Sequence, residues 1–161
     1  MKRRYKLKFV HIDAFTDSPF GGNPSGVILN ADHLNDEEIH KIARELNVRE
    51  TVFVSSSRTA DFHFRYMTPK QEIDYSGHST IAAFHALVDE GMVEIVQDVS
   101  MISLEIKTGI IQIEVVKNET TGLHEIQITH TKPKFKNTYD SKLYAEAFGL
   151  NLADIMSLYP I

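Results

Sequence analysis

The residues with the clearest chemical potential stand at the start of an apolar segment near the middle of the chain. Ser76, Gly77 and His78 lead into residues 78–90, which are rich in Ala and end before Gly91. Serine is a favoured helix N-cap, and glycine lets a ligand approach the backbone closely. Because a helix N-terminus offers free N–H groups and a positive dipole end, this stretch predicts an anion-binding site. An ordinary capped core helix is the alternative.

The apolar residues of this segment predict that it is buried. At about 100° per residue they point in nearly every direction around a helix, and a helix that is apolar all round is normally enclosed all round. These residues are Ile81, Ala82, Ala83, Phe84, Ala86, Leu87 and Val88. At roughly 20 Å, the helix is too short to span a bilayer. We therefore expect it in the middle of a soluble domain, wrapped by other elements.

The composition is that of an ordinary globular protein. With 161 residues and 42% hydrophobic residues, the chain can form a good core. Its formal net charge of −5 argues against a general nucleic-acid surface. The sequence contains no cysteine, which excludes disulfides and thiolate chemistry. No apolar run resembles a signal peptide or a membrane span, so we expect a cytoplasmic protein with no membrane partner.

Two further patterns favour structural interpretations over chemical ones. Basic residues crowd the start of the chain, and residues 1–6 are expected to form a solvated basic tail. Contact of this tail with RNA or a membrane is the alternative. His78 and His85 share a helix face but lie about 10 Å apart along its axis. The other histidines show no ligand spacing either, so we expect no metal site.

The chain as a whole predicts the α+β class. Alternating or β-branched runs predict about seven strands, over residues 7–15, 26–30, 51–55, 61–67, 103–107, 111–115 and 123–129. Capping residues and helical spacing predict helices from Asn35 and over residues 78–90, 141–148 and 152–158. Strands around one apolar helix, with further helices outside, do not form a doubly wound sheet. We expect a single domain over residues 1–161.

Four motifs, in order and at suitable spacing, resemble the PhzF-like phenazine-biosynthesis isomerase family. They occupy residues 13–24, 43–54, 65–69 and 77–80. This family is related in fold to diaminopimelate epimerase. The resemblance implies two similar domains, each a barrel-like mixed or antiparallel sheet around one buried central helix, with the active site in the cleft between them. The chain would supply the N-terminal domain only.

The resemblance also implies a site and a reaction. The family performs acid/base chemistry without a metal or an organic cofactor, and one carboxylic acid moves a proton between two substrate carbons. The matching position in this sequence is Glu50, which is therefore the expected catalytic residue. Asn23, Gly77, His78 and Ser79 are expected to bind a small, carboxylate-bearing substrate. A phenazine precursor is only one candidate for that substrate.

Two features depart from the family pattern. Arg49 stands where a small hydroxyl residue is common, and it would either weaken Glu50 as an acid or bind an acidic substrate. The chain is also about half the usual length, which leaves three hypotheses. It pairs with a second copy as a homodimer, it is a fragment that needs the missing second domain, or it is a catalytically inactive ligand-binding or interaction module.

Overall fold

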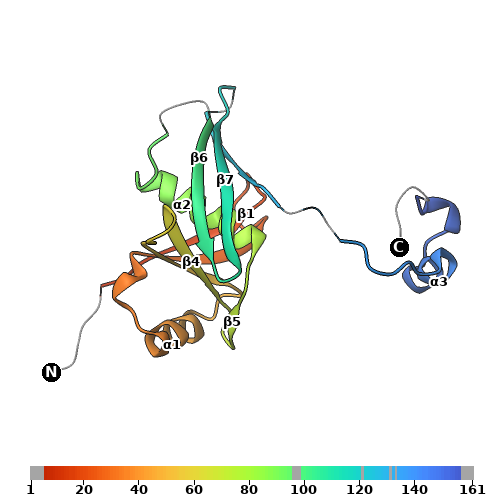
Figure 1. The fold of residues 1–161 in the computed structure, drawn as a ribbon, viewed down its shortest axis with the longest axis horizontal. Helices are drawn as coiled ribbons and strands as arrows, with labels where there is room; N and C mark the ends of the chain where they lie inside the picture. Colours follow the sequence, from red (N-terminus) through yellow and green to blue (C-terminus); the bar gives the residue numbers. More distant parts are fainter. Residues whose placement is uncertain (1–5, 96–98, 121, 131, 133, 157–161) are drawn as a thin grey trace. The chain divides into compact units, whose positions relative to one another are not determined.

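The computed structural model describes residues 6–95, 99–120, 122–130, 132 and 134–156 (Figure 1). The chain divides into two compact units, residues 1–129 and residues 130–161. Of the predicted basic tail, residues 1–6, only Lys6 lies within the described part. We describe each unit by itself.

The first unit is built on one mixed, eight-stranded sheet. Its strands are β1 (Lys8–Ala14), β2 (Asn23–Leu29), β3 (Thr51–Ser55), β4 (Phe62–Met67), β5 (Glu72–Ile73), β6 (Val99–Ile106), β7 (Gly109–Lys117) and β8 (His124–Ile128). The order is β1-β2-β3-β4-β6-β7-β8, with β5 paired to β4. The β2–β3 and β4–β6 pairs are parallel, and the others are antiparallel. The predicted α+β class is confirmed, and the two-residue strand β5 was not predicted.

The first helix begins as its sequence predicts. Helix α1 (Asp36–Leu46) has Asn35 as its N-cap. The Asn35 side chain accepts a hydrogen bond from the Glu38 N–H at 3.0 Å, and the Glu38 carboxylate accepts one from the Asn35 N–H at 3.0 Å. This capping box satisfies two N–H groups that the helix itself cannot pair. Carboxylates in the first turn add a favourable interaction with the helix dipole.

Helix α2 (Gly77–Asp89) corresponds to the apolar segment predicted over residues 78–90. It ends in the turn predicted at Gly91, which adopts a φ of 64°. There the Met92 N–H donates to the Leu87 carbonyl at 2.9 Å, which closes the last turn. Glycine adopts this left-handed conformation without steric cost.

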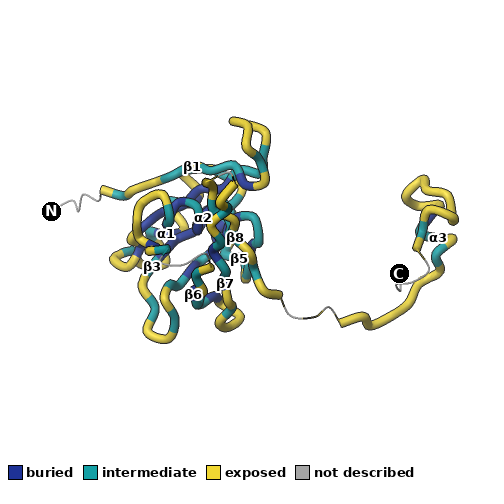
Figure 2. The backbone as a smooth tube through the Cα atoms, turned by 90° about the horizontal axis from the view of Figure 1, so that it is seen from above, coloured by how far each residue is buried: buried dark blue, intermediate teal, exposed yellow. Residues whose placement is uncertain are grey.

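The sheet curls over α2. The helix packs against β1, β2, β3 and β8, and β1 and β8 are the two ends of the strand order. Figure 2 shows buried backbone at α2 and along the strands beside it. The fully buried residues of α2 are Ser79, Thr80, Ala82, Ala83, Phe84, Ala86 and Leu87. The row formed by Ile81, His85 and Val88 is only half-buried, so enclosure of the helix on every side stays a prediction.

A second core lies on the opposite face of the sheet, under α1. It joins Ile39 and Ala43 of the helix to Ile28, Phe53 and Met67 of the strands. Strands β2, β3 and β4 therefore have apolar side chains on both faces. This explains the unbroken apolar runs at residues 27–29 of β2 and 52–54 of β3, whereas β4 alternates up to Tyr66 and adds Met67 to the second core.

An ion-pair cluster joins α1 to the sheet edge. Arg65 on β4 donates from Nε and Nη2 to the two carboxylate oxygens of Glu72 at 2.9 and 2.8 Å, and from Nη1 to Asp36 at 2.6 Å. The hydrogen bonds from Arg65 lower the pKa of Glu72, and burial opposes them to a smaller extent. The cluster connects the first turn of α1 with β4 and β5.

The Arg65 cluster predicts a pH dependence of stability. The folded-state pKa of Glu72 lies below its unfolded value near 4.5. The contribution of ionised Glu72 to the free energy of unfolding is therefore complete above that pH, and it is lost as the pH falls through the folded pKa. Arg65→Met should lower the free energy of unfolding by about 1 kcal/mol at pH 7. The variant should also lose less of its remaining unfolding free energy than the wild type does when the pH falls below about 4.5. Urea unfolding from pH 3 to pH 7 measures both effects. Arg58→Met, which replaces an exposed arginine, is the control. The same loss of unfolding free energy at low pH in the two variants would contradict the prediction.

The second unit contains α3 (Ser141–Phe148) and the short 3-10 helix η2 (Leu152–Asp154). Asp140 caps α3 by accepting from the Lys142 N–H at 2.8 Å, and Gly149 follows the helix with a φ of 67°. The sequence predicted α3 correctly. The helix predicted over residues 152–158 is wrong within the described residues, which form only a single 3-10 turn; residues 157–158 lie outside them.

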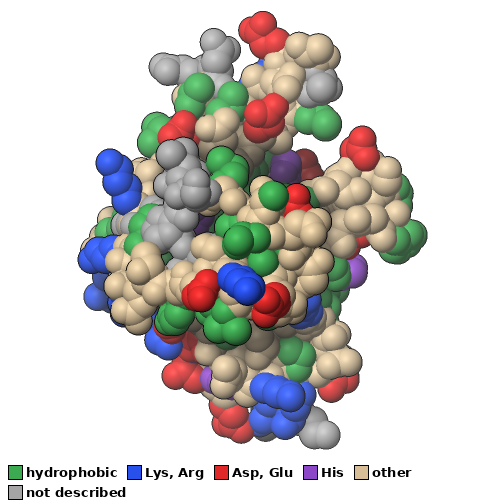
Figure 3. Space-filling view, turned by 90° about the vertical axis from the view of Figure 1, so that its right-hand side faces the viewer, with side chains coloured by type: hydrophobic (Ala, Val, Ile, Leu, Met, Phe, Trp, Pro, Cys, Tyr) green, Lys and Arg blue, Asp and Glu red, His purple; other side chains and the backbone are tan. Residues whose placement is uncertain are grey.

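The second unit buries little. Ala145 is its one buried residue within the described part. The large apolar side chains exposed after residue 134 are Phe135, Tyr139, Leu143, Phe148, Leu150, Leu152 and Met156. Hydrophobic side chains lie at the surface among charged ones in Figure 3. None of the described helices combines the length and hydropathy needed to cross a bilayer.

Candidate active site

Glu50 is held at the edge where β3 begins. Its backbone carbonyl accepts a hydrogen bond from the Gly26 N–H at 2.9 Å, at the first pair of the parallel β2–β3 register, Gly26 with Thr51. The Ser25 hydroxyl lies 3.4 Å from the same carbonyl. The backbone of Glu50 is thus fixed by β2, and its side chain is 15% exposed.

The start of α2 meets Glu50. The Ser79 hydroxyl donates to Glu50 Oε2 at 3.0 Å, although the two residues are 29 positions apart in the chain. His78 Nε2 lies 3.7 Å from the same oxygen, and the His78 side chain is 12% exposed. The structure therefore brings three of the predicted site residues into one polar group. We call Glu50, Ser76, His78 and Ser79 the Glu50 cluster.

Ser76 is the member of the cluster that was predicted only as a helix cap. It is the N-cap residue of α2, but its side chain makes no capping hydrogen bond. Its hydroxyl instead donates to Ser79 Oγ at 3.1 Å and lies 3.2 Å from His78 Nδ1. The one sequence signal for Ser76 was its position before Gly77, and that signal pointed to the cap.

Buried hydroxyl groups anchor the first turn of α2 to the sheet. The Thr80 hydroxyl donates to the Ser76 carbonyl at 2.6 Å, and Tyr66 Oη on β4 lies 2.7 Å from Thr80 Oγ1. Because the proton of Thr80 is committed to Ser76, Tyr66 is the donor in the second bond. Burial raises the pKa of Tyr66 well above its usual range. Tyr66 therefore keeps its proton and holds the helix start in place.

Gly77 lies within the sequence of the cluster, between Ser76 and His78, whereas Asn23 lies at the start of β2. Gly77 is the first residue of α2, and a Cβ there would meet only Tyr75 Oη at 3.6 Å and Tyr75 Cε1 at 4.0 Å. The protein's own packing thus does not require glycine at this position. Asn23 begins β2, at the same end of the strand as Ser25. No side-chain hydrogen bond joins Asn23 to the cluster in the described part of the chain.

Arg49 makes no ion pair with Glu50 among the described residues, and its expected role in binding an acidic substrate stays a prediction. Its side chain is exposed. Within the residues that the structure describes, no ion pair joins Arg49 to Glu50, whereas His78 lies close to the Glu50 carboxylate. The titratable side chain next to the Glu50 carboxylate therefore comes from α2 and not from the preceding residue.

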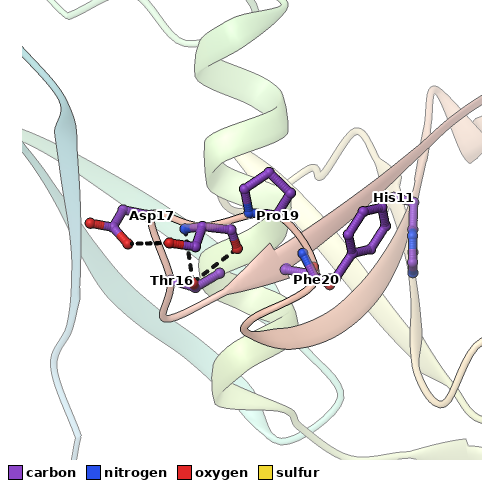
Figure 4. Close-up of a pocket in the computed structure, with 7 residues that line it drawn as sticks. His11, Thr16, Asp17, Pro19 and Phe20 are labelled. Carbon is purple, nitrogen blue, oxygen red and sulfur yellow. Dashed lines mark hydrogen bonds between the residues drawn. The ribbon is translucent and has the colours of Figure 1, made fainter.

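The loop between β1 and β2 forms a separate pocket, shown in Figure 4. Its cavity is about 360 Å³ and is lined by His11, Asp13, Thr16, Asp17, Ser18, Pro19 and Phe20. Asp13 accepts a hydrogen bond from the Phe20 N–H at 3.0 Å. Phe15 and Phe20 both have a φ of 64°, which is strained for a bulky side chain. The sequence indicated a turn-rich loop here, but it did not reveal the strain or the pocket.

Gly22, at the end of this loop, is required by packing. A Cβ on Gly22 would lie 2.3 Å from the Ala14 carbonyl oxygen. Only glycine lets the chain return this closely to β1 and enter β2 at Asn23.

Among the described residues, no group of three or more His, Cys, Asp or Glu side chains is arranged to hold a metal ion.

Comparisons with known proteins agree with this architecture. Residues 12–157 match the family described as "Phenazine biosynthesis-like protein" (PhzC-PhzF). The chain is 36% identical, over 162 residues, to the uncharacterized isomerase YfhB of Bacillus subtilis, covering 100% of this chain and 53% of YfhB. It is 37% identical, over 166 residues, to an uncharacterized isomerase of Clostridium acetobutylicum, covering 100% of this chain and 52% of that protein. The chain thus spans about half the length of these curated relatives.

Solved structures show the same fold in proteins of which this chain covers about half. A PhzF-family phenazine biosynthesis protein of Bacillus anthracis superposes with a TM-score of 0.78 at 38% identity, covering 98% of this chain and 52% of that one. A predicted epimerase of Pseudomonas aeruginosa gives a TM-score of 0.71 at 23% identity, covering 96% of this chain and 54% of that one. The second likeness concerns the fold alone. Together they show a diaminopimelate epimerase-like fold with a curled, mixed sheet.

Proposed function

The chain belongs to the phenazine biosynthesis-like (PhzC-PhzF) protein family, and we propose that it forms one half of an isomerase active site. In this proposal Glu50 is the acid/base that moves a proton between two carbons of a small, carboxylate-bearing substrate. No metal or organic cofactor takes part. The relatives named as isomerases support the reaction class, and the Glu50 cluster supports the assignment of residues.

One observation carries the proposal: Glu50 lies against the start of α2, with Ser79 Oγ at 3.0 Å and His78 Nε2 at 3.7 Å from its Oε2. A carboxylate can remove a proton next to an activating group if it is held within hydrogen-bond reach of that proton. Removal of the proton leaves negative charge on the substrate. The first N–H groups of α2 and the His78 ring provide donors for that charge.

The other substrate contacts follow from the same placement. We assign the substrate carboxylate to the N–H groups at Gly77 and His78, because α2 presents its positive dipole end there. Packing within the chain does not explain Gly77, which is consistent with close approach of a ligand. Asn23 is assigned to the border of the same site, at the entrance to β2.

We further propose that a second half-domain closes the site. The matched relatives are about twice as long as this chain, and the first unit contains every predicted site residue. The half-buried row on α2, formed by Ile81, His85 and Val88, would then be covered in the complete enzyme. Either a second copy of this chain or a C-terminal half like that of the relatives closes the site.

Solvent-deuterium uptake tests the reaction. The chain, alone and mixed with the C-terminal half of YfhB, is incubated in D2O with amino acids, cyclic imino acids and unsaturated cyclic carboxylic acids. We expect mass spectrometry to detect deuterium at carbon in at least one compound, with faster uptake when the C-terminal half is present. Light scattering over a dilution series shows whether a second copy already fills that role. Binding of a compound without deuterium uptake in either mixture would favour the inactive binding module.

A further inference from the structure

The two carboxylate oxygens of Glu50 are not equivalent. Oε2 accepts the hydrogen bond from Ser79 at 3.0 Å and faces His78 Nε2 at 3.7 Å. No protein group within the described residues bonds to Oε1. The Glu50 side chain is nevertheless mostly buried, at 15% exposure. Within the described residues, one oxygen of Glu50 is thus held by the protein and the other has no hydrogen-bond partner.

The hydroxyl groups of Ser76 and Ser79 form a row of hydrogen bonds that ends at Glu50, which we call the hydroxyl chain. The number of protons available fixes the direction of these bonds. Each serine hydroxyl has one proton and can accept two hydrogen bonds. Ser79 gives its proton to Glu50, and Ser76 gives its proton to Ser79. His78 Nδ1 lies 3.2 Å from Ser76 Oγ and His78 Nε2 lies 3.3 Å from Ser79 Oγ, and a neutral ring, which carries one N–H, can donate to only one of these hydroxyls. Both hydroxyl groups of the hydroxyl chain, those of Ser76 and Ser79, therefore direct their protons toward Glu50 Oε2.

The burial of the hydroxyl chain separates it from the substrate. Ser79 is 0% exposed and Ser76 is 7% exposed. Ser79 accepts from Ser76 and donates to Glu50, so its hydroxyl has little capacity left for a ligand. Ser76 sends its hydroxyl into this chain instead of capping α2, although capping is the usual role of an N-cap serine. Such a departure from a local rule is typical of a functional site.

We propose that Ser79 is a positioning residue for Glu50 and not a substrate contact. Its hydroxyl, polarised by Ser76, clamps Oε2 and fixes the carboxylate plane so that Oε1 faces the substrate and transfers the proton. The assignment of proton transfer to Oε1 rests on the proposed function. The clamping of Oε2 is a property of the folded chain and is testable without any substrate.

The test compares Ser79→Ala and Ser76→Ala with Ser103→Ala. Ser103 is a matched control, because its hydroxyl also donates to a carboxylate, Asp61 Oδ2 at 2.6 Å, in a different part of the sheet. Each variant is prepared with 13C at the glutamate carboxyl carbons, and the Glu50 resonance is assigned by its absence in Glu50→Gln. We expect a large shift of that resonance in Ser79→Ala, a smaller shift in the same direction in Ser76→Ala, and none in Ser103→Ala.

An unmoved Glu50 resonance in folded Ser79→Ala would overturn the proposal. If Ser79→Ala does not fold, Ser76→Ala decides in the same way. In the deuterium-uptake assay, Ser79→Ala should lower kcat about 10-fold with little change in KM, since misorientation of a held group affects the chemical step. If no compound takes up deuterium but the resonance shifts as expected, the clamp stands and the proposed reaction fails. If uptake requires Glu50 but Ser79→Ala changes neither kcat nor the resonance, the clamp fails alone.

Discussion

Glu50→Gln is expected to reduce deuterium uptake by at least about 100-fold, the lower end of what a general base contributes. Glutamine has the size of glutamate, and its carbonyl oxygen can still accept the hydrogen bond from Ser79. It cannot take up and return a proton. The loss should therefore appear in the chemical step, and the urea unfolding free energy should change by less than about 1 kcal/mol.

Glu45→Gln is the matched control for this variant. It makes the same chemical change at an exposed residue of α1, so its uptake rate should equal that of the wild type. Purified Glu50→Gln with wild-type uptake would remove Glu50 from the mechanism. Equal losses in both variants would indicate a general effect of charge instead.

Phe84→Ala is expected to lower the free energy of unfolding by about 3–5 kcal/mol, a large share of the roughly 5–15 kcal/mol typical of a domain. Phe84 lies at the centre of α2 and is 0% exposed. Its ring packs against Phe64 and Phe62, with centroids 5.3 and 6.2 Å away. Truncation would leave a cavity between the helix and β4, and the surrounding backbone can close it only in part.

Phe20→Ala provides the contrast. Phe20 is 96% exposed, so the same substitution should change the unfolding free energy by less than about 0.5 kcal/mol. Urea unfolding monitored by circular dichroism measures both variants. Similar values for Phe84→Ala and Phe20→Ala would contradict the assignment of α2 to the core.

Local signals in the sequence predicted α1 and α2 well, whereas the 3-10 helix η1 (Ala31–His33) was not predicted. Asn35 and Glu38 form a capping box that depends on residues three positions apart, and such short-range chemistry can be read directly from sequence. The end of α2 at Gly91 is similar, because one residue in the left-handed conformation decides it. In the second unit the same approach failed after Asn151, since apolar spacing alone does not distinguish a helix from a single 3-10 turn.

Short-range sequence patterns could not predict how the strands pair or that the hydroxyl groups of Ser76 and Ser79 are bonded to each other and to Glu50. The parallel pairs β2–β3 and β4–β6 join segments separated by intervening elements, and strand patterns do not specify partners. Strand β5 has two residues and no visible period. Ser76 was interpreted as a cap because nothing in its neighbourhood indicates that Ser79 and Glu50 lie within reach of its hydroxyl.

The site residues divide in the same manner. Chemistry alone indicated the helix start at Gly77 and His78, whereas Glu50 and Asn23 came only from the resemblance to a family. The structure joins Glu50 to His78 and Ser79 through contacts between β3 and α2. It adds Ser76, and it leaves Asn23 without a side-chain hydrogen bond to the group among the described residues.

An NMR titration tests whether the substrate binds at Glu50 and the start of α2. The 15N-labelled chain is titrated with a compound that takes up deuterium, or with each carboxylate of the panel, and NMR detects even weak binding to half a site. We expect the amide signals of Glu50, Gly77, His78 and Ser79 to shift first and to saturate together. Saturating shifts confined to the separate loop pocket around Phe20, with these four amides unmoved, would contradict it.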